Sequence, residues 1–200
     1  MIKCEDFTVC AVISKAAEVK KNGDGQPFIT FNVRVPVMGR DGSGYLTVSV
    51  SADGDMGDTS YYSLDRRVTI HGSLSPRKKG ENIYYNLRAD DLRIENSNVS
   101  DKLEGKMYFK GKVGKQGVTE KKDSKENPFQ TFSAYSSDRN GDTTEYTWVR
   151  FLNFKPCHEP FLAANSFIEV KGDLQLSFYK GKISLECVVA EISQWVLEQR

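Results

Sequence analysis

Residues 145–154 read Glu-Tyr-Thr-Trp-Val-Arg-Phe-Leu-Asn-Phe, and this stretch gives the first indication of the fold. Its residues alternate as in a β-strand, in which successive side chains point to opposite faces. Val149 and Phe151 fall on one face, which suits a core. Trp148 and Arg150 fall on the other, and a ring beside a cation suits a flat, negatively charged ligand such as a nucleic-acid strand. The alternative is that Trp148 covers a sheet edge or a subunit contact.

Outside this stretch, the chain contains an internal repeat with a period of about 100 residues. The pattern Pro-Phe-x-Thr-Phe at residues 27–31 recurs at residues 128–132. The pattern apolar-x-apolar-x-Gly-x-Leu at residues 68–74 recurs at residues 168–174. Matches that keep one order and nearly one offset are hard to obtain by chance, so the sequence predicts two copies of one small β unit.

In each copy, alternating apolar residues between turn signals predict five strands, with closing-hairpin tips at residues 76–82 and 178–182. An irregular segment follows the third strand, and residues 157–164 are expected to form one or two helical turns there. Five strands with a short helix between the third and fourth is the plan of the OB fold, a Greek-key barrel. The predicted fold class is therefore all-β, with two tandem OB-fold (five-stranded Greek-key barrel) domains at residues 1–98 and 104–200 and short helical segments between strands 3 and 4.

The charge balance restricts the function. Of the 200 residues, 28% are charged, yet the net charge is only +1. Residues 1–100 carry 13 basic and 13 acidic side chains, and residues 101–200 carry 15 and 14. Because phosphate contacts usually need a basic excess, this balance is the strongest argument against a nucleic-acid ligand. Any positive field must come from local clusters.

The cysteines, the apolar segments and the N-terminus indicate where in the cell the protein is expected. The four cysteines are widely spaced, which is typical of reduced thiols. No apolar run approaches the roughly 20 residues that cross a bilayer. The N-terminus lacks the basic-then-apolar pattern of a secretion signal. We therefore expect a cytoplasmic or nucleoid-associated protein that is not secreted.

The second copy resembles the bacterial single-stranded-DNA-binding (SSB) protein family, here as a tandem OB-fold variant. Residues 106–114 are similar to that family's opening strand, residues 145–154 to its Glu-Trp-x-Arg third strand, and residues 167–174 to its fourth strand. The resemblance implies single-stranded DNA binding without sequence preference, which coats and protects the strand in replication or recombination. The family ends in an acidic, partner-recruiting tail, whereas residues 194–200 here are not acidic, so recruitment is not implied.

By this resemblance, Trp148, Phe154 and Tyr179 stand where the family has base-stacking rings, and Arg150 stands where it has a strand arginine that faces DNA. The first copy has Thr47 at the position of Trp148, so weaker binding, through charge more than stacking, is expected there.

The other candidates come from strand faces and basic segments. Phe28 and Phe129 have an alternative interpretation as core residues at the barrel ends. The full predicted nucleic-acid-binding set is Trp148, Arg150, Phe154, Tyr179, Tyr146, Phe129, Tyr135, Lys180, Lys182, Tyr45, Phe28, Arg34, Arg77, Lys78 and Lys79.

Catalytic and metal sites are not predicted. The two histidines, His71 and His158, have no partners at a spacing that suggests a catalytic pair or a zinc site. Residues 53–58 resemble the start of a calcium loop, but Leu64 stands where the bidentate Glu is required. We expect no enzyme activity, no metal and no cofactor.

The predicted partner is single-stranded DNA, with RNA or an oligosaccharide as weaker candidates and no membrane. A homodimer would give four OB folds. The leading alternative from another class is an OB-fold protein–protein interaction or assembly module with no nucleic-acid role, which near-neutral charge favours. Salt dependence separates the two, because phosphate neutralisation makes affinity fall steeply with salt.

Overall fold

The computed structural model describes residues 1–39, 42–140 and 142–196, and it is all-β as predicted. Within the described part, the only helical element is a single four-residue 3-10 turn. In chain order the elements are β1 (Ile2–Lys21), β2 (Pro27–Gly39), β3 (Gly42–Asp53), η1 (Thr59–Tyr62), β4 (Arg67–Lys79), β5 (Asn82–Glu95), β6 (Lys102–Val113), β7 (Thr119–Lys122), β8 (Pro128–Asn140), β9 (Thr143–Asn153), β10 (Phe167–Tyr179) and β11 (Lys182–Gln194).

The first five strands close into a barrel. β1 pairs with β2 and β4, β2 pairs with β3, and β4 pairs with β5, all antiparallel. A parallel pairing between β3 and β5 completes the ring. Within this barrel the long β1 pairs with both β2 and β4, because register shifts between Ile13 and Glu18 bend it, as bulges do.

The second half repeats this plan. β6, β8, β9, β11 and β10 close into a ring with one parallel pairing, between β9 and β11. One bulge lies in β5, where Asp90 is the extra residue opposite the step from His71 to Gly72 in β4. Its counterpart lies in β11, where Ala190 is the extra residue opposite the step from Lys171 to Gly172 in β10, at the predicted offset. The prediction of two tandem OB folds is therefore confirmed.

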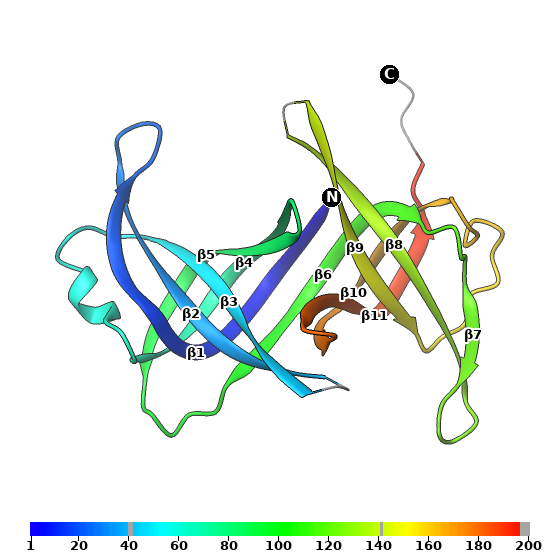
Figure 1. The fold of residues 1–200 in the computed structure, drawn as a ribbon, viewed down its shortest axis with the longest axis horizontal. Coiled ribbons are helices and arrows are strands. Elements are labelled where there is room, and N and C mark those ends of the chain that lie inside the picture. Colours follow the sequence, from blue (N-terminus) through cyan, green and yellow to red (C-terminus); the bar gives the residue numbers. More distant parts are fainter. Residues whose placement is uncertain (40–41, 141, 197–200) are drawn as a thin grey trace.

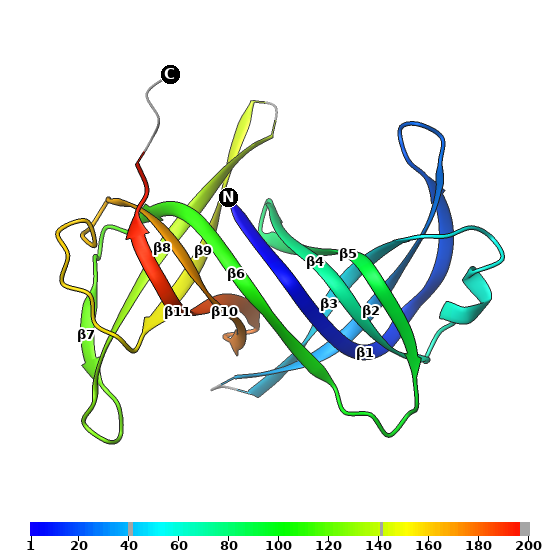
Figure 2. The same ribbon diagram turned by 180° about the vertical axis from the view of Figure 1, so that it is seen from behind.

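The two barrels join through their first strands. β1 pairs antiparallel with β6, from Ile2 opposite Phe109 to Cys10 opposite Lys102, so that one sheet runs through both halves. Figures 1 and 2 show β1 and β6 side by side in the middle of the molecule, with a barrel on either side. β5 ends at Glu95 and β6 begins at Lys102; the domain boundaries at residues 98 and 104 stay a prediction.

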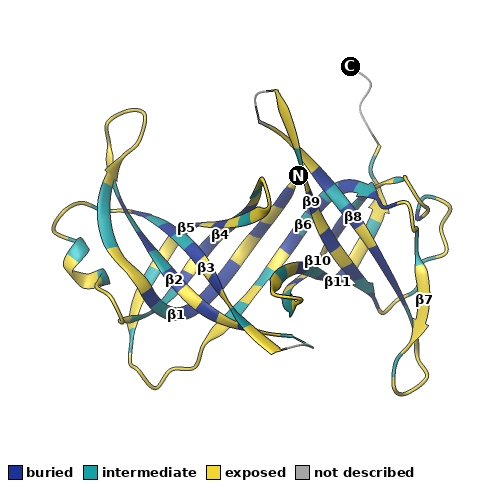
Figure 3. Cartoon of the chain, viewed as in Figure 1, coloured by how far each residue is buried: buried dark blue, intermediate teal, exposed yellow. Residues whose placement is uncertain are grey.

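Alternation along the strands decides which side chains form the core, and Figure 3 shows it as bands of buried and exposed residues. In β9, Val149 and Phe151 are buried while Trp148 is exposed, which confirms the predicted faces. Phe151 packs between Phe132 and Phe109, with ring centroids 4.9 Å and 5.0 Å apart. The side chains on the outer face of β9, including Trp148, therefore do not pack in the core.

The expected helical turns at residues 157–164 are wrong, because this segment holds bends and turns without a helix. The buried Gln130 side chain explains the difference. Its Oε1 accepts the backbone N–H of Cys157 (2.8 Å), and its Nε2 donates to the Cys157 carbonyl (3.1 Å), so the backbone at the start of this segment is fixed to β8. Pro160 also disfavours helical backbone at the residue before it.

The closing hairpins are tighter than predicted. β4 continues to Lys79 and β10 to Tyr179. Most of the residues expected in the two tips therefore belong to strands, and only two residues remain in each turn. The end of β4 is polar, so apolar alternation gave no sign that this strand continues. The strand β7, which is entirely polar and exposed, was missed for the same reason. Residues 197–200, within the predicted non-acidic end, lie outside the described residues.

Candidate nucleic-acid interface

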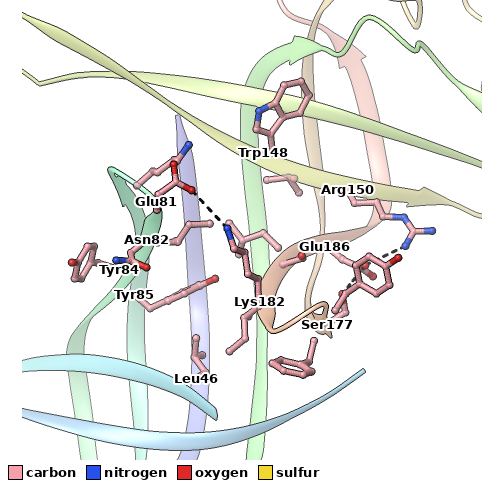
Figure 4. A pocket seen from close by; sticks show the side chains of 18 of the residues that line it. Leu46, Glu81, Asn82, Tyr84, Tyr85, Trp148, Arg150, Ser177, Lys182 and Glu186 are labelled. Carbon is pink, nitrogen blue, oxygen red and sulfur yellow. Dashed lines mark hydrogen bonds and ion pairs between the residues drawn. The ribbon is translucent and has the colours of Figure 1, made fainter. Parts of the chain in front are cut away.

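A cleft of about 1360 Å³ lies between the two barrels and is lined by both of them. The first barrel supplies residues of β2 and β3 and of the β4–β5 hairpin; the second supplies β8, β9 and the β10–β11 hairpin. Figure 4 shows Trp148 and Arg150 on one side, Tyr84 and Tyr85 on another, and Lys182 between them. The strand pairing of β1 with β6 holds these surfaces facing each other.

Five exposed aromatic rings line this cleft. The second barrel contributes Tyr146, Trp148 and Tyr179, with exposed fractions of 47%, 49% and 47%. The first barrel contributes Tyr45 and Tyr84, at 64% and 51%. Four of them, all but Tyr179, stand next to a buried residue in their strands, and exposed rings of this size offer flat faces for stacking.

Tyr135 on β8 supports the indole of Trp148 from the side. It lies directly opposite Trp148 in the strand ladder, with ring centroids 4.9 Å apart. Its ring also makes an edge contact with Tyr146 at 5.4 Å. Three rings are thus held as one group, which lowers the entropy lost when a ligand stacks on them.

The cleft has a small excess of positive charge. Its cations are Lys78, Lys121, Arg150 and Lys182, and its anions are Glu81 and Glu186. Arg150 lies 3.4 Å from Glu186, whose Oε1 also accepts the Ser177 hydroxyl at 2.9 Å.

Two polar contacts at the cleft join the barrels. The Lys182 ammonium lies 3.7 Å from Glu81, and the Gly80 backbone N–H donates to the Glu145 carboxylate (3.1 Å). Both side chains of the Lys182–Glu81 pair are largely exposed, and such pairs contribute little stability. An anionic ligand can therefore displace Glu81 from Lys182 at low cost.

The floor of the cleft is apolar. Leu46, Tyr85 and Leu185 are buried beneath the exposed rings. Burial raises the pKa of Tyr85 well above its ordinary value, and within the described residues its hydroxyl has no hydrogen-bond partner. Gly39 of β2 and Gly44 of β3 lie so close to Phe178 that a Cβ at either position would collide with that residue.

The first barrel presents a simpler face at the equivalent positions. Thr47 pairs with Arg34 where Trp148 pairs with Tyr135 in the second barrel. The Arg34 guanidinium lies over the ring of Tyr45, 4.7 Å from its centroid. A cation on one ring thus replaces the three-ring group.

The structure brings together most of the predicted residues. Those that line the cleft are Tyr45, Lys78, Tyr146, Trp148, Arg150, Tyr179 and Lys182. Three more contact these rings directly: Tyr135, Arg34, and Lys180, whose ammonium is 5.2 Å from the Tyr179 centroid. Their role in ligand binding stays a prediction.

The other predicted residues do not line the cleft. Phe129 and Phe154 stack on each other at 5.4 Å near the far end of β9, and neither is buried, so the core interpretation of Phe129 is wrong. Phe28 is likewise half-buried at the start of β2, outside the core. Arg77 and Lys79 are exposed at the end of β4, in strand and not in the expected loop.

Sequence reasoning missed several lining residues, above all Tyr84, Tyr85, Phe178 and Lys121. The adjacent pair Tyr84-Tyr85 in the closing hairpin was an available signal, because alternation sends one ring outward and the other inward. Lys121 belongs to a basic pair with Lys122, but its place in the fold could not be predicted, since β7 has no apolar pattern.

Across residues 1–39, 42–140 and 142–196, no three His, Cys, Asp or Glu side chains are grouped so that they could hold a metal ion. Among the same residues, no helix has the length and apolar character needed to span a membrane. The expected lack of enzyme activity and of cofactors stays a prediction.

The chain is similar in structure to the single-stranded DNA binding protein from Thermus aquaticus. Against a deletion mutant of that protein the TM-score is 0.51 at 10% identity, covering all of this chain and 97% of the other. Against the wild-type protein the TM-score is 0.50 at 7% identity, covering all of this chain and 95% of the other. At this identity the shared property is the fold. No protein-family model and no curated protein sequence matches the chain.

Proposed function

We propose that the protein binds single-stranded DNA without sequence preference in the cleft between its two barrels. The observation that carries this proposal is that five exposed rings and four cations, drawn from both halves, converge on one cleft. Every base has a π face, so ring platforms bind bases without reading them.

Stacking on these rings can supply enough binding free energy for DNA although the net charge of the chain is only +1. Stacking contributes about 1–3 kcal/mol per base, so three to five platforms can support strong binding with few phosphate contacts. The four cations exceed the two carboxylates of the cleft, and this local excess is what the backbone of the ligand would meet. With roughly 4–16 nucleotides per OB fold, one chain is expected to cover about ten to thirty.

The fold of the Thermus aquaticus protein, a single-stranded DNA binding protein, supports the same ligand. We extend the proposal to a non-catalytic role in coating and protecting DNA in replication or recombination, at a cytoplasmic or nucleoid-associated location. Two chains are proposed to form a homodimer with four OB folds. Light scattering after size exclusion, with and without oligo-dT, measures that association.

The direct test is titration with oligo-dT while protein fluorescence is followed, first at low salt and then at increasing salt. We expect quenching of Trp148 and an affinity that falls with salt, because bound phosphates release counterions. Random-sequence DNA should bind about as well as oligo-dT. Unchanged emission together with no gel shift at low salt would exclude the proposal. Competition with oligo-rU measures whether RNA binds the same cleft.

The second candidate is an assembly module whose aromatic cleft binds a protein. The observation that favours it is the even charge balance of both halves, since net charge contributes little attraction to phosphates. This candidate predicts no oligonucleotide binding at any salt concentration. Association with a protein partner, retained at high salt, would be its characteristic result.

A further inference from the structure

A row of side chains leads from Trp148 away from the cleft, across the outside of the second barrel. Trp148 on β9 is the direct ladder partner of Tyr135 on β8, Tyr135 is the partner of Lys112 on β6, and Lys112 is the partner of Phe167 on β10. Trp195, just after β11, extends the row, because its backbone N–H donates to the Phe167 carbonyl (3.1 Å).

Alternation fixes the outward direction of this row. The chain neighbours Val113, Ala134, Val149 and Ile168 are all buried in the barrel, so the row members between them must point the other way. Phe167 is 37% exposed.

Most neighbouring side chains of the row are also in contact with each other. The rings of Phe167 and Trp195 make an edge contact at 5.7 Å, and the Lys112 ammonium lies 5.7 Å from the Phe167 centroid. With the contact between Trp148 and Tyr135, the row reads ring, ring, cation, ring, ring. This is the same pairing of platforms and positive charge that lines the cleft.

Of the three lysines in or beside the row, Lys112 is the one without a carboxylate partner among the described residues. Lys110, which lies 6.0 Å from the Trp195 centroid, is held by Glu169 at 3.2 Å. Lys171 is held by Glu191 at 3.3 Å. Lys112, in contrast, contacts no carboxylate within the described residues, so its charge is available to a phosphate.

We propose that a DNA strand leaving the cleft past Trp148 continues along this row, with Lys112 binding its backbone and Phe167 and Trp195 receiving bases. This inference rests on the proposed function and adds a second contact region to it. DNA is the occupant because Trp148 belongs to both the cleft and the row, so that the two contact regions are continuous. Four strand-to-strand steps of about 4.8 Å give a path of roughly 19 Å. At about 3.4 Å per stacked nucleotide, that is room for about five further nucleotides.

The two tryptophans of the chain allow each region to be followed alone. The variant Trp195→Phe leaves Trp148 as the reporter, and Trp148→Phe leaves Trp195 while keeping a ring in the cleft. Each is titrated with oligo-dT of increasing length, from about 6 to about 30 nucleotides. We expect Trp148 to be quenched by short and long oligonucleotides alike. Trp195 should be quenched only by oligonucleotides that exceed the shortest one quenching Trp148 by about five nucleotides or more.

A charge variant gives a readout that does not depend on fluorescence. Lys112→Ala should lower the salt slope of long-oligonucleotide binding by about 0.7, the value for one phosphate contact on a single strand. Its slope for short oligonucleotides should not change. Lys102→Ala on the same strand is the matched control, because Lys102 is paired with Glu104 at 2.6 Å and lies outside the row.

The outcomes separate the two proposals. If Trp148 is quenched but Trp195 responds at no length, and Lys112→Ala leaves the slope unchanged, the row is excluded and the cleft stands. If neither tryptophan responds and nothing binds, both proposals fail. If Phe167→Ala changes the oligomeric state without changing DNA affinity, the row is a protein contact, which overturns the inference.

Discussion

The indole of Trp148 lies 4.9 Å from the ring of Tyr135, its direct partner across the β8–β9 ladder. The equivalent ladder position in the first barrel pairs Thr47 with Arg34. One cross-strand pair therefore distinguishes the two copies of the repeat and gives each exposed face its own chemistry. Matched substitutions at the two positions can measure that difference directly.

Replacing Trp148 by Ala should weaken oligo-dT binding by about 1–3 kcal/mol, the contribution of one stacked base. This corresponds to roughly 5- to 150-fold in the dissociation constant, measured by fluorescence anisotropy of a labelled oligonucleotide. Thr47→Ala is the matched control and should leave the affinity unchanged. Equal losses in the two variants would show that the platform in the second barrel has no special role.

Gly114→Ala should weaken binding without removing the indole. A Cβ at Gly114 would lie 3.1 Å from the Trp148 ring and 3.1 Å from the Ser133 carbonyl oxygen, so the ring must move. We expect a shifted Trp148 emission spectrum and an affinity loss under about tenfold, less than that of Trp148→Ala. Gly23→Ala, with no atom within 4 Å of its added carbon, serves as control. An unchanged spectrum would contradict this placement of the indole.

Glu186→Gln should strengthen DNA binding. The carboxylate lies 3.4 Å from Arg150 and competes with phosphate for the guanidinium. Because Arg150 is half-exposed, and ion pairs that reach the surface contribute about 0–1 kcal/mol, we expect an affinity gain of up to about fivefold at low salt. Glu18→Gln removes the same charge where Lys15 and Lys20 hold it, outside the cleft, and controls for net charge. Equal gains in both variants would assign the effect to net charge alone.

Gly72→Ala and Gly172→Ala should destabilise the two barrels alike. In each case the added carbon would collide with a carbonyl oxygen of the neighbouring strand, that of Arg88 or that of Val188. Overpacking of this kind costs roughly 1–3 kcal/mol, measured by urea unfolding. Gly23→Ala should leave the unfolding midpoint unchanged. A large loss at only one of the two glycines would mean that the bulges of the repeat are not equivalent.

Alkaline pH should weaken the fold through its buried thiols. Burial raises the pKa of Cys4 and of Cys187 to about 12, from an ordinary value of 9.0. The folded state thus keeps these protons while the unfolded state loses them, so the free energy of unfolding falls as pH rises from about 9 to about 12. Urea unfolding across this range measures the slope, and Cys187→Ala should make it shallower. Equal slopes in the variant and the parent protein would contradict this assignment.

Thiol labelling provides a second check of the same burial. At pH 8 the folded protein should expose Cys157 to a thiol reagent, because it alone among the cysteines is only half-buried. Cys4, Cys10 and Cys187 should react only after unfolding, since reaction requires an accessible thiolate. Rapid reaction of all four cysteines in the folded protein would contradict the described core.

Much of the fold was predictable because it depends on local patterns. The alternation around Trp148 fixed the faces of β9, and the repeated patterns around Gly72 and Gly172 marked equivalent strands of the two copies. The predicted helical turns failed because a distant side chain, Gln130, binds both backbone groups of Cys157. No pattern within residues 157–164 contains that contact. The polar end of β4 and the strand β7 were missed for a related reason, since their pairing leaves no apolar signal.

The sequence alone determined the two-copy β architecture, because strand alternation and repeat spacing depend only on the order of residues. The same alternation predicted most of the rings and cations that are found around one cleft. The tertiary structure decided that the barrels share that cleft. This depends on the pairing of β1 with β6, a contact between segments about 100 residues apart whose register no local pattern encodes. Strand pairing also places Lys112, Phe167 and Trp195 in one row with Trp148, since neighbours across a sheet are set by pairing and not by position in the chain.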